Sequence, residues 1–341
     1  MTAPVLVTGG SGFVGGALLV RLVSDGRATR ALARSDQTAA ALADAGAEPV
    51  RGDLGDVGSL VDAMRGCDLV FHAGGINAMC QRDPAPMMRT NIEGAASVVR
   101  AAAAAGVTRV VHTSSAATVG EARGTVGRED SPHRGWYLSR YEESKFLAER
   151  EVLSLGRELG VEVICVNPSS VQGPGRTGGS ARLLLELLRG RLPIVDTFLS
   201  IVDVHDCTEG HLLAAARGRA GERYLLNGVT LQTRHLAGLL RAETGRPHRI
   251  PRVPRAAAAI AGALGEVGGA VARRDPPICR ELARTVLHGH RYDGSRAVRE
   301  LGLDYTPIRD TIARTVAWYE ANSLIESAGT SAPGGNHGLS G

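Results

Sequence analysis

The sequence predicts an α/β fold: a doubly wound parallel sheet with helices on both faces, followed by a smaller and mainly helical lobe. In the first half, short apolar runs alternate regularly with segments of helical periodicity, which is the pattern of a parallel sheet. Runs such as VLV, LVF, VVH and VICV are continuously apolar, as strands covered on both faces should be. After Pro168 the alternation gives way to helical patterns.

The elements of the first half follow from these apolar runs and from glycines that end helices, such as Gly46 and Gly66. We expect strands at residues 4–8, 29–33, 49–52, 69–72, 109–113 and 161–166. We expect helices at residues 12–25, 37–45, 57–65, 86–106 and 141–160.

The second half contains fewer strands. A glycine-rich loop, QGPGRTGG, precedes a short amphipathic helix in ARLLLELLRG, and TFLSIVDVHDCTEGHLLAAARG reads as a strand and a helix. ERYLLNG reads as another strand, residues 233–322 as mainly helical, and the Gly/Ser-rich tail as disordered. We therefore expect a first domain at 1–170, completed by a strand and a helix within 200–230, a substrate lobe at 171–199 and 231–325, and a disordered tail at 326–341.

Composition excludes several classes of function. The formal net charge is only +4, and the basic residues are scattered among acids, so nucleic-acid binding is not expected. No uncharged apolar run reaches the ~18 residues of a membrane span. The longest candidate, residues 256–272, reads as a soluble helix pair or a hydrophobic wall, with contact to a membrane surface as the weaker alternative.

Cysteine usage and the N-terminus bear on the compartment. The five cysteines show no CxxC spacing and are odd in number, so neither a disulfide framework nor a zinc site is expected, and no metal is assigned. The start, MTAPVLVTGG, lacks the basic and apolar regions of a signal peptide. A reducing cytoplasm is therefore the expected location.

The stretch VLVTGGSGFVGG lies between the first expected strand and the first expected helix. Gly9 permits a tight turn, Gly12 lets backbone N–H groups approach a pyrophosphate, and Gly15 allows close helix–sheet contact. The phosphate then lies at a helix N-terminus, which favours an anion. A glycine triplet alone is weak evidence, but this one follows a strand and opens a helix. We expect a dinucleotide at Gly9, Gly12, Phe13 and Val14.

Residues after the second and third expected strands bear on the choice of cofactor. A carboxylate after the second strand would bind the adenosine ribose, whereas a cation suits the 2′-phosphate of NADP. Arg34 stands there, with Asp36 two residues on, so NADP is favoured, NAD remains possible, and a plain surface arginine is the alternative. Asp53 and Leu54 follow the third strand and are expected beside the adenine, although Asp53 could instead cap a helix.

Tyr141 and Lys145 lie four residues apart at the start of an expected helix, so they share a face. Lys145 is the only lysine among 39 Lys and Arg residues. An ammonium beside a phenol stabilises the phenolate and lowers the tyrosine pKa, which suits proton transfer near neutral pH. Lys145 could also hold the nicotinamide ribose, where arginine's planar fork would substitute poorly. An incidental surface pair is the alternative.

Hydroxyl groups follow the fifth expected strand in VVHTSSAATVG. They should lie at the carboxyl edge of the sheet, where ligands bind in this kind of fold. Ser115 is expected to hydrogen-bond the reacting oxygen, and Ser114 is its competitor. Either could instead cap the backbone at the strand end.

Taken in order, the motifs TGGSGFVGG, GDL, FHAGG, NIEGAASVVRAA, HTSSAATVG, YEESK and NPSSVQGPG resemble those of the extended short-chain dehydrogenase/reductase family, over residues 4 to about 320. The resemblance implies a Rossmann-type domain with Ser115, Tyr141 and Lys145 as the catalytic triad. It also implies contributions near the nicotinamide from Asn91 and from the segment between Pro168 and Val171. Read alone, Asn91 could be an ordinary helix-surface amide. Dimers through the helices at 86–106 and 141–160 are common in the family, so a homodimer is possible here.

Departures from family patterns narrow the branch. Dehydratase branches carry an Asp-Glu pair after the strand-five hydroxyl, whereas Ala116 and Ala117 follow Ser115 here. Nucleotide-sugar epimerases usually place an arginine where this chain has Leu199, although Arg284 or Arg291 could supply charge. The remaining resemblance is to dihydroflavonol-reductase, 3β-hydroxysteroid-dehydrogenase and hopanoid-associated epimerase-like branches. GINAMCQRDP is expected to line an apolar substrate cleft, with Met79 and Cys80 in its wall.

These observations predict an enzyme: an NADP-dependent carbonyl reductase or alcohol dehydrogenase acting on a fairly apolar small molecule. Tyr141 would be the general acid/base, Ser115 would orient the reacting oxygen, and Lys145 would tune Tyr141 and bind the ribose. One alternative is a nucleotide-sugar 4-epimerase with tightly held NAD. An alternative of another class is a non-catalytic NADP sensor or scaffold. The substrate and the direction of reaction stay open.

Overall fold

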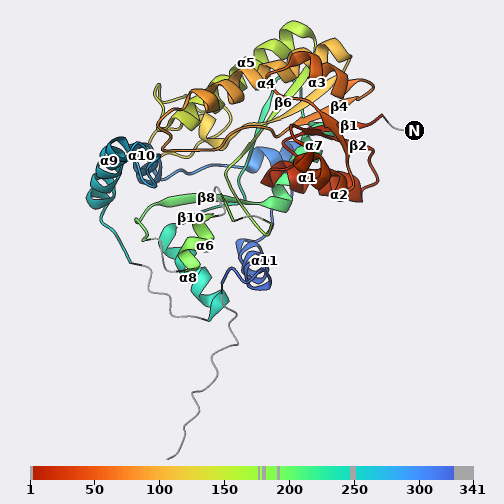
Figure 1. Cartoon of the computed structure of the whole chain (residues 1–341). Helices are drawn as coiled ribbons and strands as arrows, with labels where there is room; N and C mark the ends of the chain where they lie inside the picture. Colours follow the sequence, from red (N-terminus) through yellow and green to blue (C-terminus); the bar gives the residue numbers. More distant parts are fainter. Residues whose placement is uncertain (1–2, 176, 179–181, 190–192, 246–250, 326–341) are drawn as a thin grey trace, which may run out of the picture.

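The computed structural model describes residues 3–325 except 176, 179–181, 190–192 and 246–250. Parts of the expected loop QGPGRTGG, and the whole tail at 326–341, therefore lie outside the described residues. Within the described chain, the elements form a large sheet with helices on both faces and a second, smaller region beside it (Figure 1).

The large sheet has seven strands, all parallel, in the order β3-β2-β1-β4-β5-β6-β9. Its inner strands are apolar throughout because both faces are covered. Along β1, Leu6 packs into the core on one face, whereas Val5 and Val7 pack into the core on the other. The strands are β1 (Val5–Thr8), β2 (Thr29–Ala33), β3 (Glu48–Arg51), β4 (Leu69–His72), β5 (Arg109–Thr113), β6 (Glu162–Pro168) and β9 (Arg223–Leu226).

Two layers of helices cover this sheet (Figure 1). One layer packs side by side above the sheet in Figure 1 and consists of α3 (Val57–Met64), α4 (Ala85–Ala105) and α5 (Arg140–Leu159). The other face is covered by α1 (Phe13–Ser24), α2 (Asp36–Asp44) and α7 (Val204–Arg217). A short 3₁₀ helix, η1 (Ala116–Val119), follows β5.

The smaller region is not purely helical. A three-stranded sheet in the order β10-β8-β7 packs with helices around its own apolar core. Its strands are β7 (Ser170–Gln172), β8 (Phe198–Asp203) and β10 (Val229–Gln232), and the packing helices are α6 (Arg182–Leu188), α8 (Thr233–Thr244) and α11 (Ile308–Ala321). A separate pair, α9 (Arg255–Ala272) and α10 (Arg280–His288), lies at one side of the molecule (Figure 1). A π-helical turn, η3 (Ala297–Leu301), precedes α11.

The expected elements agree with the structure within one or two residues through β6, because apolar runs and helix-ending glycines mark them clearly. The strand within 200–230 that joins the large sheet is β9, whereas β8 pairs with β7 and β10 in the small sheet. Neither β7 nor β10 was predicted. Their sequences, SVQ and VTLQ, mix apolar and polar residues and lack the continuous apolar run that marked the buried strands.

The expectation that the cysteines form no disulfide is wrong. Cys80, in the loop after β4, is bonded to Cys279, which precedes α10, across 199 residues of sequence. The sequence suggested that Cys80 is a free side chain in the wall of a cleft. The disulfide bond means that Cys80 has no free thiol in this structure. The fold brings the two cysteines together, with their Cα atoms 5.4 Å apart, and sequence spacing carries no sign of that contact.

Helix α9 is the segment in which the sequence left membrane contact open. Its exposed side includes Ile260, Leu264, Val267 and Val271. Across the described part of the chain, no helix combines the length and the hydrophobicity that a membrane crossing requires.

Candidate active site

The strand order places a ligand-binding crevice at one point of the sheet. From β1 the chain proceeds outward through β2 to β3, and from β4 it proceeds the other way through β5 to β6. The carboxyl ends of β1 and β4 therefore diverge at their junction, which is where ligands bind in open parallel sheets. The glycine loop and the Ser115 segment both lie at this edge.

The glycine loop has the geometry that a dinucleotide requires. Gly9 has φ of +72°, and a Cβ there would lie 2.6 Å from the backbone of Ala73 and Gly74. A Cβ on Gly15 would overlap the backbone of Gly9, so helix and strand can approach only without side chains. Gly12 caps α1 with no side-chain hydrogen bond, which leaves the first N–H groups of the helix open to an anion.

Ser115 and Tyr141 are hydrogen-bonded to each other at this edge. Ser115 follows β5 directly, and Tyr141 lies in the first turn of α5, which Ser139 caps by accepting from the N–H of Glu142 at 3.1 Å. Both hydroxyl-bearing residues are partly exposed. Of the two candidate serines, the structure therefore brings Ser115 to Tyr141.

Ser114, the competitor, points into the protein instead. It is 5% exposed, and its hydroxyl donates to the carboxylate of Glu149. The same carboxylate oxygen accepts from Thr118 at 3.1 Å and from the side-chain amide of Asn167, while Arg223 pairs with the other oxygen at 3.0 Å. Sequence reasoning missed this buried network, which holds the backbone that carries Ser115.

The pKa of Tyr141 shifts in the opposite direction from the sequence-based expectation. Burial raises the pKa above its ordinary value, and the hydrogen bond with Ser115 opposes this shift only in part. The expected lowering by Lys145 is not seen: desolvation of the phenolate sets the direction, and only the contact with Ser115 opposes it.

Lys145 is buried, with 7% of its surface exposed, one turn after Tyr141. Its Nζ donates to the carbonyl oxygen of Thr113, the last residue of β5, at 2.7 Å. Burial lowers the pKa of Lys145 to about 8. Lys145 therefore lies against the end of β5 that leads to Ser115, and it loses its proton more readily than an exposed lysine would.

Residues 5–227 match the model of the NAD dependent epimerase/dehydratase family. The chain belongs to that family. Sterol demethylase protein B of Methylococcus capsulatus is 31% identical over 333 residues, which cover 94% of this chain and 99% of that protein. A 4-hydroxy-2-methyl-3-oxo-4-farnesyl-3,4-dihydroquinoline-1-oxide ketoreductase of Stigmatella aurantiaca is 34% identical over 267 residues, covering 76% of this chain and 79% of its own.

The similarity extends to solved structures. The crystal structure of gox2253 is 30% identical and superposes with a TM-score of 0.83, covering 95% of this chain and 100% of its own. The family match and the similarity to these proteins show that the chain is an NAD(P)-dependent oxidoreductase of the extended short-chain dehydrogenase/reductase type. The glycine cradle described above fits the dinucleotide that such an oxidoreductase uses.

Two arginines of the oxidoreductase lie at the carboxyl ends of β2 and β3, where the sequence predicted the adenosine end of the cofactor. Arg34 follows β2, is exposed, and has no ion-pair or hydrogen-bond partner among the described residues. Arg51 ends β3 directly beside Ala33 and pairs with Asp36 at 3.2 Å. Arg51 was not assigned from the sequence. The available signal was an arginine at the end of the strand that neighbours β2, the strand before Arg34.

Asp53 and Leu54 follow β3 in the oxidoreductase. The carboxylate of Asp53 accepts from the N–H of Gly55 at 2.8 Å, and the N-cap of α3 is Asp56, not Asp53. The capping alternative for Asp53 is therefore wrong. Leu54 lies against Gly94 of α4, where an added Cβ would be 3.1 Å away.

Asn91 of the oxidoreductase is buried on α4, so it is not an ordinary surface amide. Its side chain exchanges hydrogen bonds with the backbone of Ile76, at 2.8 and 2.9 Å, and donates to Ser144 of α5 at 2.9 Å. The amide thus fixes the loop after β4 against both long helices. The polar side-chain atoms of Asn91 are therefore engaged in positioning this loop.

The segment from Pro168 to Val171 links the two sheets. Pro168 ends β6 in the large sheet, and Val171 lies in β7, paired with Val202 of β8. Val171 is buried in the core that also contains α1 and α7 side chains. Phe13 packs against the same core from the start of α1, and Val14 lies beside it.

Proposed function

We propose that the protein is an NADP-dependent carbonyl reductase or alcohol dehydrogenase that acts on a fairly apolar small molecule. The hydrogen bond between Ser115 and Tyr141 at the carboxyl edge of the sheet carries this proposal. It pairs a proton donor with a second hydroxyl, and both residues are partly exposed to the crevice. This is the arrangement that polarises a carbonyl oxygen and protonates it.

In this proposal the bound nicotinamide supplies or accepts the hydride at the substrate carbon. Tyr141 gives a proton to the substrate oxygen during reduction and takes it back during oxidation. Ser115 donates to the same oxygen and orients it. Lys145 holds its charge beside Tyr141 and binds the nicotinamide ribose, with Thr113 fixing its ammonium at 2.7 Å.

The preference for NADP rests on charge at the adenosine end. Arg34 is exposed and unpartnered among the described residues, and Arg51 lies on the next strand. Two guanidinium groups suit the dianionic 2′-phosphate. The nearby carboxylate, Asp36, is paired with Arg51 at 3.2 Å, which makes it a poorer acceptor for ribose hydroxyls.

An apolar substrate is supported by the relatives' names, which refer to a sterol and to a farnesylated quinoline. The loop after β4 supports it too, since Met79 lies in it next to the disulfide-bonded Cys80.

A nucleotide-sugar 4-epimerase with tightly held NAD is the second candidate, and one observation favours it. A cavity of about 240 Å³ beside β8 is lined by Arg123, Arg255 and Arg291, which could bind a diphosphate. Leu199 argues against this candidate, because it packs against the core of the smaller region and pairs with Leu231. A non-catalytic NADP sensor or scaffold is disfavoured because such a chain would not need the Ser115–Tyr141 pair.

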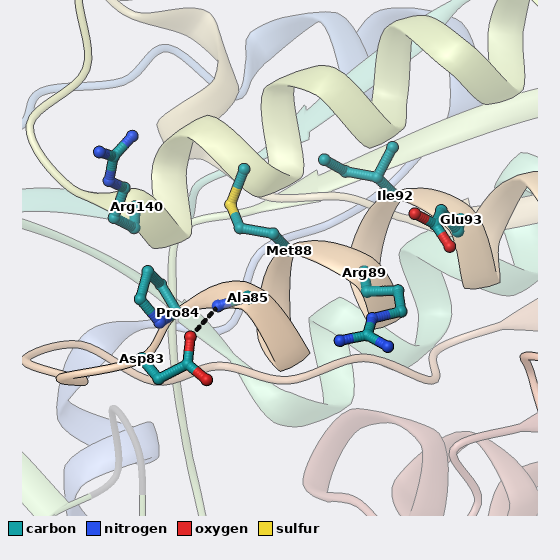
Figure 2. Close-up of a pocket in the computed structure, with 8 residues that line it drawn as sticks. All are labelled: Asp83, Pro84, Ala85, Met88, Arg89, Ile92, Glu93 and Arg140. Carbon is teal, nitrogen blue, oxygen red and sulfur yellow. Dashed lines mark hydrogen bonds between the residues drawn. The ribbon is translucent and has the colours of Figure 1, made fainter.

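We also propose a homodimer through the outer faces of α4 and α5. Figure 2 shows an open hollow on this face, with Met88 and Ile92 of α4 and Arg140 at the start of α5 around it. Its volume is about 450 Å³, and the exposed Leu147 adds apolar surface on α5. The molar mass in solution, measured by light scattering, should be twice that of the chain and should fall to one chain in Met88→Arg.

We also propose that the protein is cytoplasmic, as the sequence predicts. In that reducing compartment Cys80 and Cys279 would rest as a dithiol.

The function itself is tested by titrating the purified protein with NADPH and NADH, followed by a panel of carbonyl substrates monitored at the nicotinamide absorbance. Tighter NADPH binding and turnover of apolar ketones are expected. Stoichiometric bound NAD with no net consumption would instead establish the epimerase.

A further inference from the structure

A carboxylate and two imidazoles meet outside the proposed catalytic triad. Glu121 follows η1, whereas His288 ends α10 and His290 comes two residues later. Oε1 of Glu121 lies 2.7 Å from Nδ1 of His290 and 3.3 Å from Nε2 of His288. One ligand atom from each residue lies within 4.8 Å of the other two.

Hydrogen bonds alone do not satisfy this cluster. Nδ1 of His290 lies 2.7 Å from Glu121 and 2.8 Å from the hydroxyl of Tyr292, so it faces two oxygen atoms. Oε2 of Glu121 and Nε2 of His288 are buried and have no hydrogen-bond partner among the described residues. Buried polar atoms without partners are rare and call for a missing ligand or water.

We propose that Glu121, His288 and His290 form a binding site for a divalent transition metal of the zinc class. Two imidazoles and one carboxylate are a typical zinc donor set, with a fourth position left for water or another oxygen. Bonds of about 2.0–2.1 Å to a tetrahedral ion put neighbouring ligand atoms about 3.3 Å apart. The Glu121–His288 distance of 3.3 Å fits this value, and His290 needs to withdraw only slightly from 2.7 Å.

Glu121 supplies the one anionic donor of the cluster, beside the two imidazoles. The guanidinium of Arg134 donates to the backbone carbonyl oxygen of Glu121 at 3.3 Å and forms an ion pair with Glu142. Arg291 stacks over the ring of Phe198, with its guanidinium carbon 3.7 Å from the ring centroid.

The position of the site has a structural consequence. His288 and Gly289 line the cavity of about 240 Å³ described above, together with Arg123, Arg255 and Arg291, so the site borders that cavity. Glu121 belongs to the segment that begins at Ser115, whereas His288 ends α10 and His290 follows it. A bound ion would tie these two regions together near Tyr292, which packs with Ala116 and Val119 of η1. Sequence reasoning assigned no metal because it considered cysteine spacing.

The test is metal binding by the full-length protein after treatment with a chelator. Titration calorimetry with ZnCl₂ should show one ion per chain, and CoCl₂ should give the visible absorption of tetrahedral cobalt bound by nitrogen and oxygen. Glu121→Gln and His290→Ala should each weaken zinc binding by at least about 100-fold. His235→Ala, which removes an exposed histidine of α8, is the matched control and should bind like the unaltered protein.

Circular dichroism shows whether the variants fold, and His290 is partly exposed, so its truncation should be tolerated. If neither variant folds, the cobalt spectrum of the unaltered protein shows which kinds of ligand atom bind the ion. Nitrogen–oxygen bands support the site, and a thiolate charge-transfer band overturns it. The proposal is also overturned if the unaltered protein takes up no zinc, or if Glu121→Gln and His290→Ala bind zinc as tightly as His235→Ala.

Discussion

Nζ of Lys145 donates a hydrogen bond to the carbonyl oxygen of Thr113 at 2.7 Å, so α5 is tied to the end of β5 directly before the Ser114-Ser115 pair. The helix that carries Tyr141 and the strand that precedes Ser115 are thereby held in one geometry. Lys145 therefore links the first turns of α5 to the end of β5.

Lys145→Arg should lower kcat/KM by about 100-fold or more, the usual contribution of a positioned acid/base group. The wider guanidinium cannot occupy the buried site under Thr113 without displacing its neighbours, and its charge cannot be lost. Steady-state kinetics at the nicotinamide absorbance measures the effect. Arg157→Lys, in the last turn of the same helix, is the matched control and should leave kcat/KM unchanged. Activity of Lys145→Arg equal to that of the control would contradict the role of Lys145.

Ser115→Ala and Ser114→Ala should separate catalysis from stability. Loss of the Ser115 hydroxyl should reduce kcat by about 10²-fold and lower the free energy of unfolding by about 1 kcal/mol at most, because the hydroxyl also accepts from the N–H of Ala117 at 3.3 Å. Loss of the Ser114 hydroxyl leaves the buried carboxylate of Glu149 short of a donor, and should cost about 1–3 kcal/mol in stability. Steady-state kinetics and denaturant unfolding of both variants measure kcat and the free energy of unfolding. Reversed effects would mean that Ser114 is the catalytic hydroxyl.

Much of this site was predictable from the sequence because its signals are local. The glycine loop needs a backbone that only glycine allows, and Tyr141 and Lys145 share a helix face at a spacing of four. The glutamate network was not predictable. Glu149 lies on α5, whereas its partners Ser114, Asn167 and Arg223 lie after β5, on β6 and on β9, and only the fold brings them together.

Arg34→Ala and Arg51→Ala should each raise the Kd for NADPH by about tenfold or more, because a charge-assisted hydrogen bond contributes about 1.5–3 kcal/mol. The Kd for NADH should change little, since NADH lacks the 2′-phosphate. Fluorescence titration of both cofactors measures this selectivity. Arg65→Ala, an exposed arginine at the end of α3, serves as the control. A parallel loss of NADH affinity would contradict the assignment of these arginines to the phosphate.

Stability should fall as the pH drops from about 6.5, the ordinary histidine pKa, towards 4. Burial lowers the pKa of His72 to about 3 and of His211 to about 4, and it also lowers the pKa of His112. Each imidazole stays neutral when folded but takes up a proton when unfolded in this window, so acid favours unfolding. Denaturant unfolding at several pH values measures the slope.

Both ring nitrogens of His112 are buried without hydrogen-bond partners among the described residues. His112→Leu should therefore flatten the acid slope, because it removes one of the titrating groups. His235→Asn, at an exposed position, should leave the slope unchanged. A slope that is identical in all three proteins would show that buried histidines do not govern acid stability.

Reduction of the Cys80–Cys279 bond should destabilise the protein by about 2–4 kcal/mol, since the bond closes a long loop of the unfolded chain. It should also loosen α10 from the loop after β4, although Glu281 still accepts from the backbone N–H groups of Cys80 and Arg140 at 3.4 and 3.0 Å. Thermal melts with and without reductant measure the change. Cys279→Ser should melt like the reduced protein and show no effect of reductant. Free thiols at both positions in the unreduced protein would contradict the bond.

The pKa of Tyr141 marks another limit of sequence reasoning. A spacing of four identifies which groups are neighbours, but it does not reveal how deeply they are buried. Desolvation decides the direction of the shift at Tyr141, and burial depends on packing that no local pattern records. The same limit explains why the contact between Cys80 and Cys279 was missed.

The most direct measurement of the central claim compares Tyr141→Phe with the unaltered protein, using NADPH binding and turnover of a ketone substrate found in the panel. Phenylalanine keeps the ring and removes only the hydroxyl that is hydrogen-bonded to Ser115. The account predicts an unchanged Kd for NADPH and a turnover reduced by about 10³-fold or more. Full turnover in Tyr141→Phe would contradict the account.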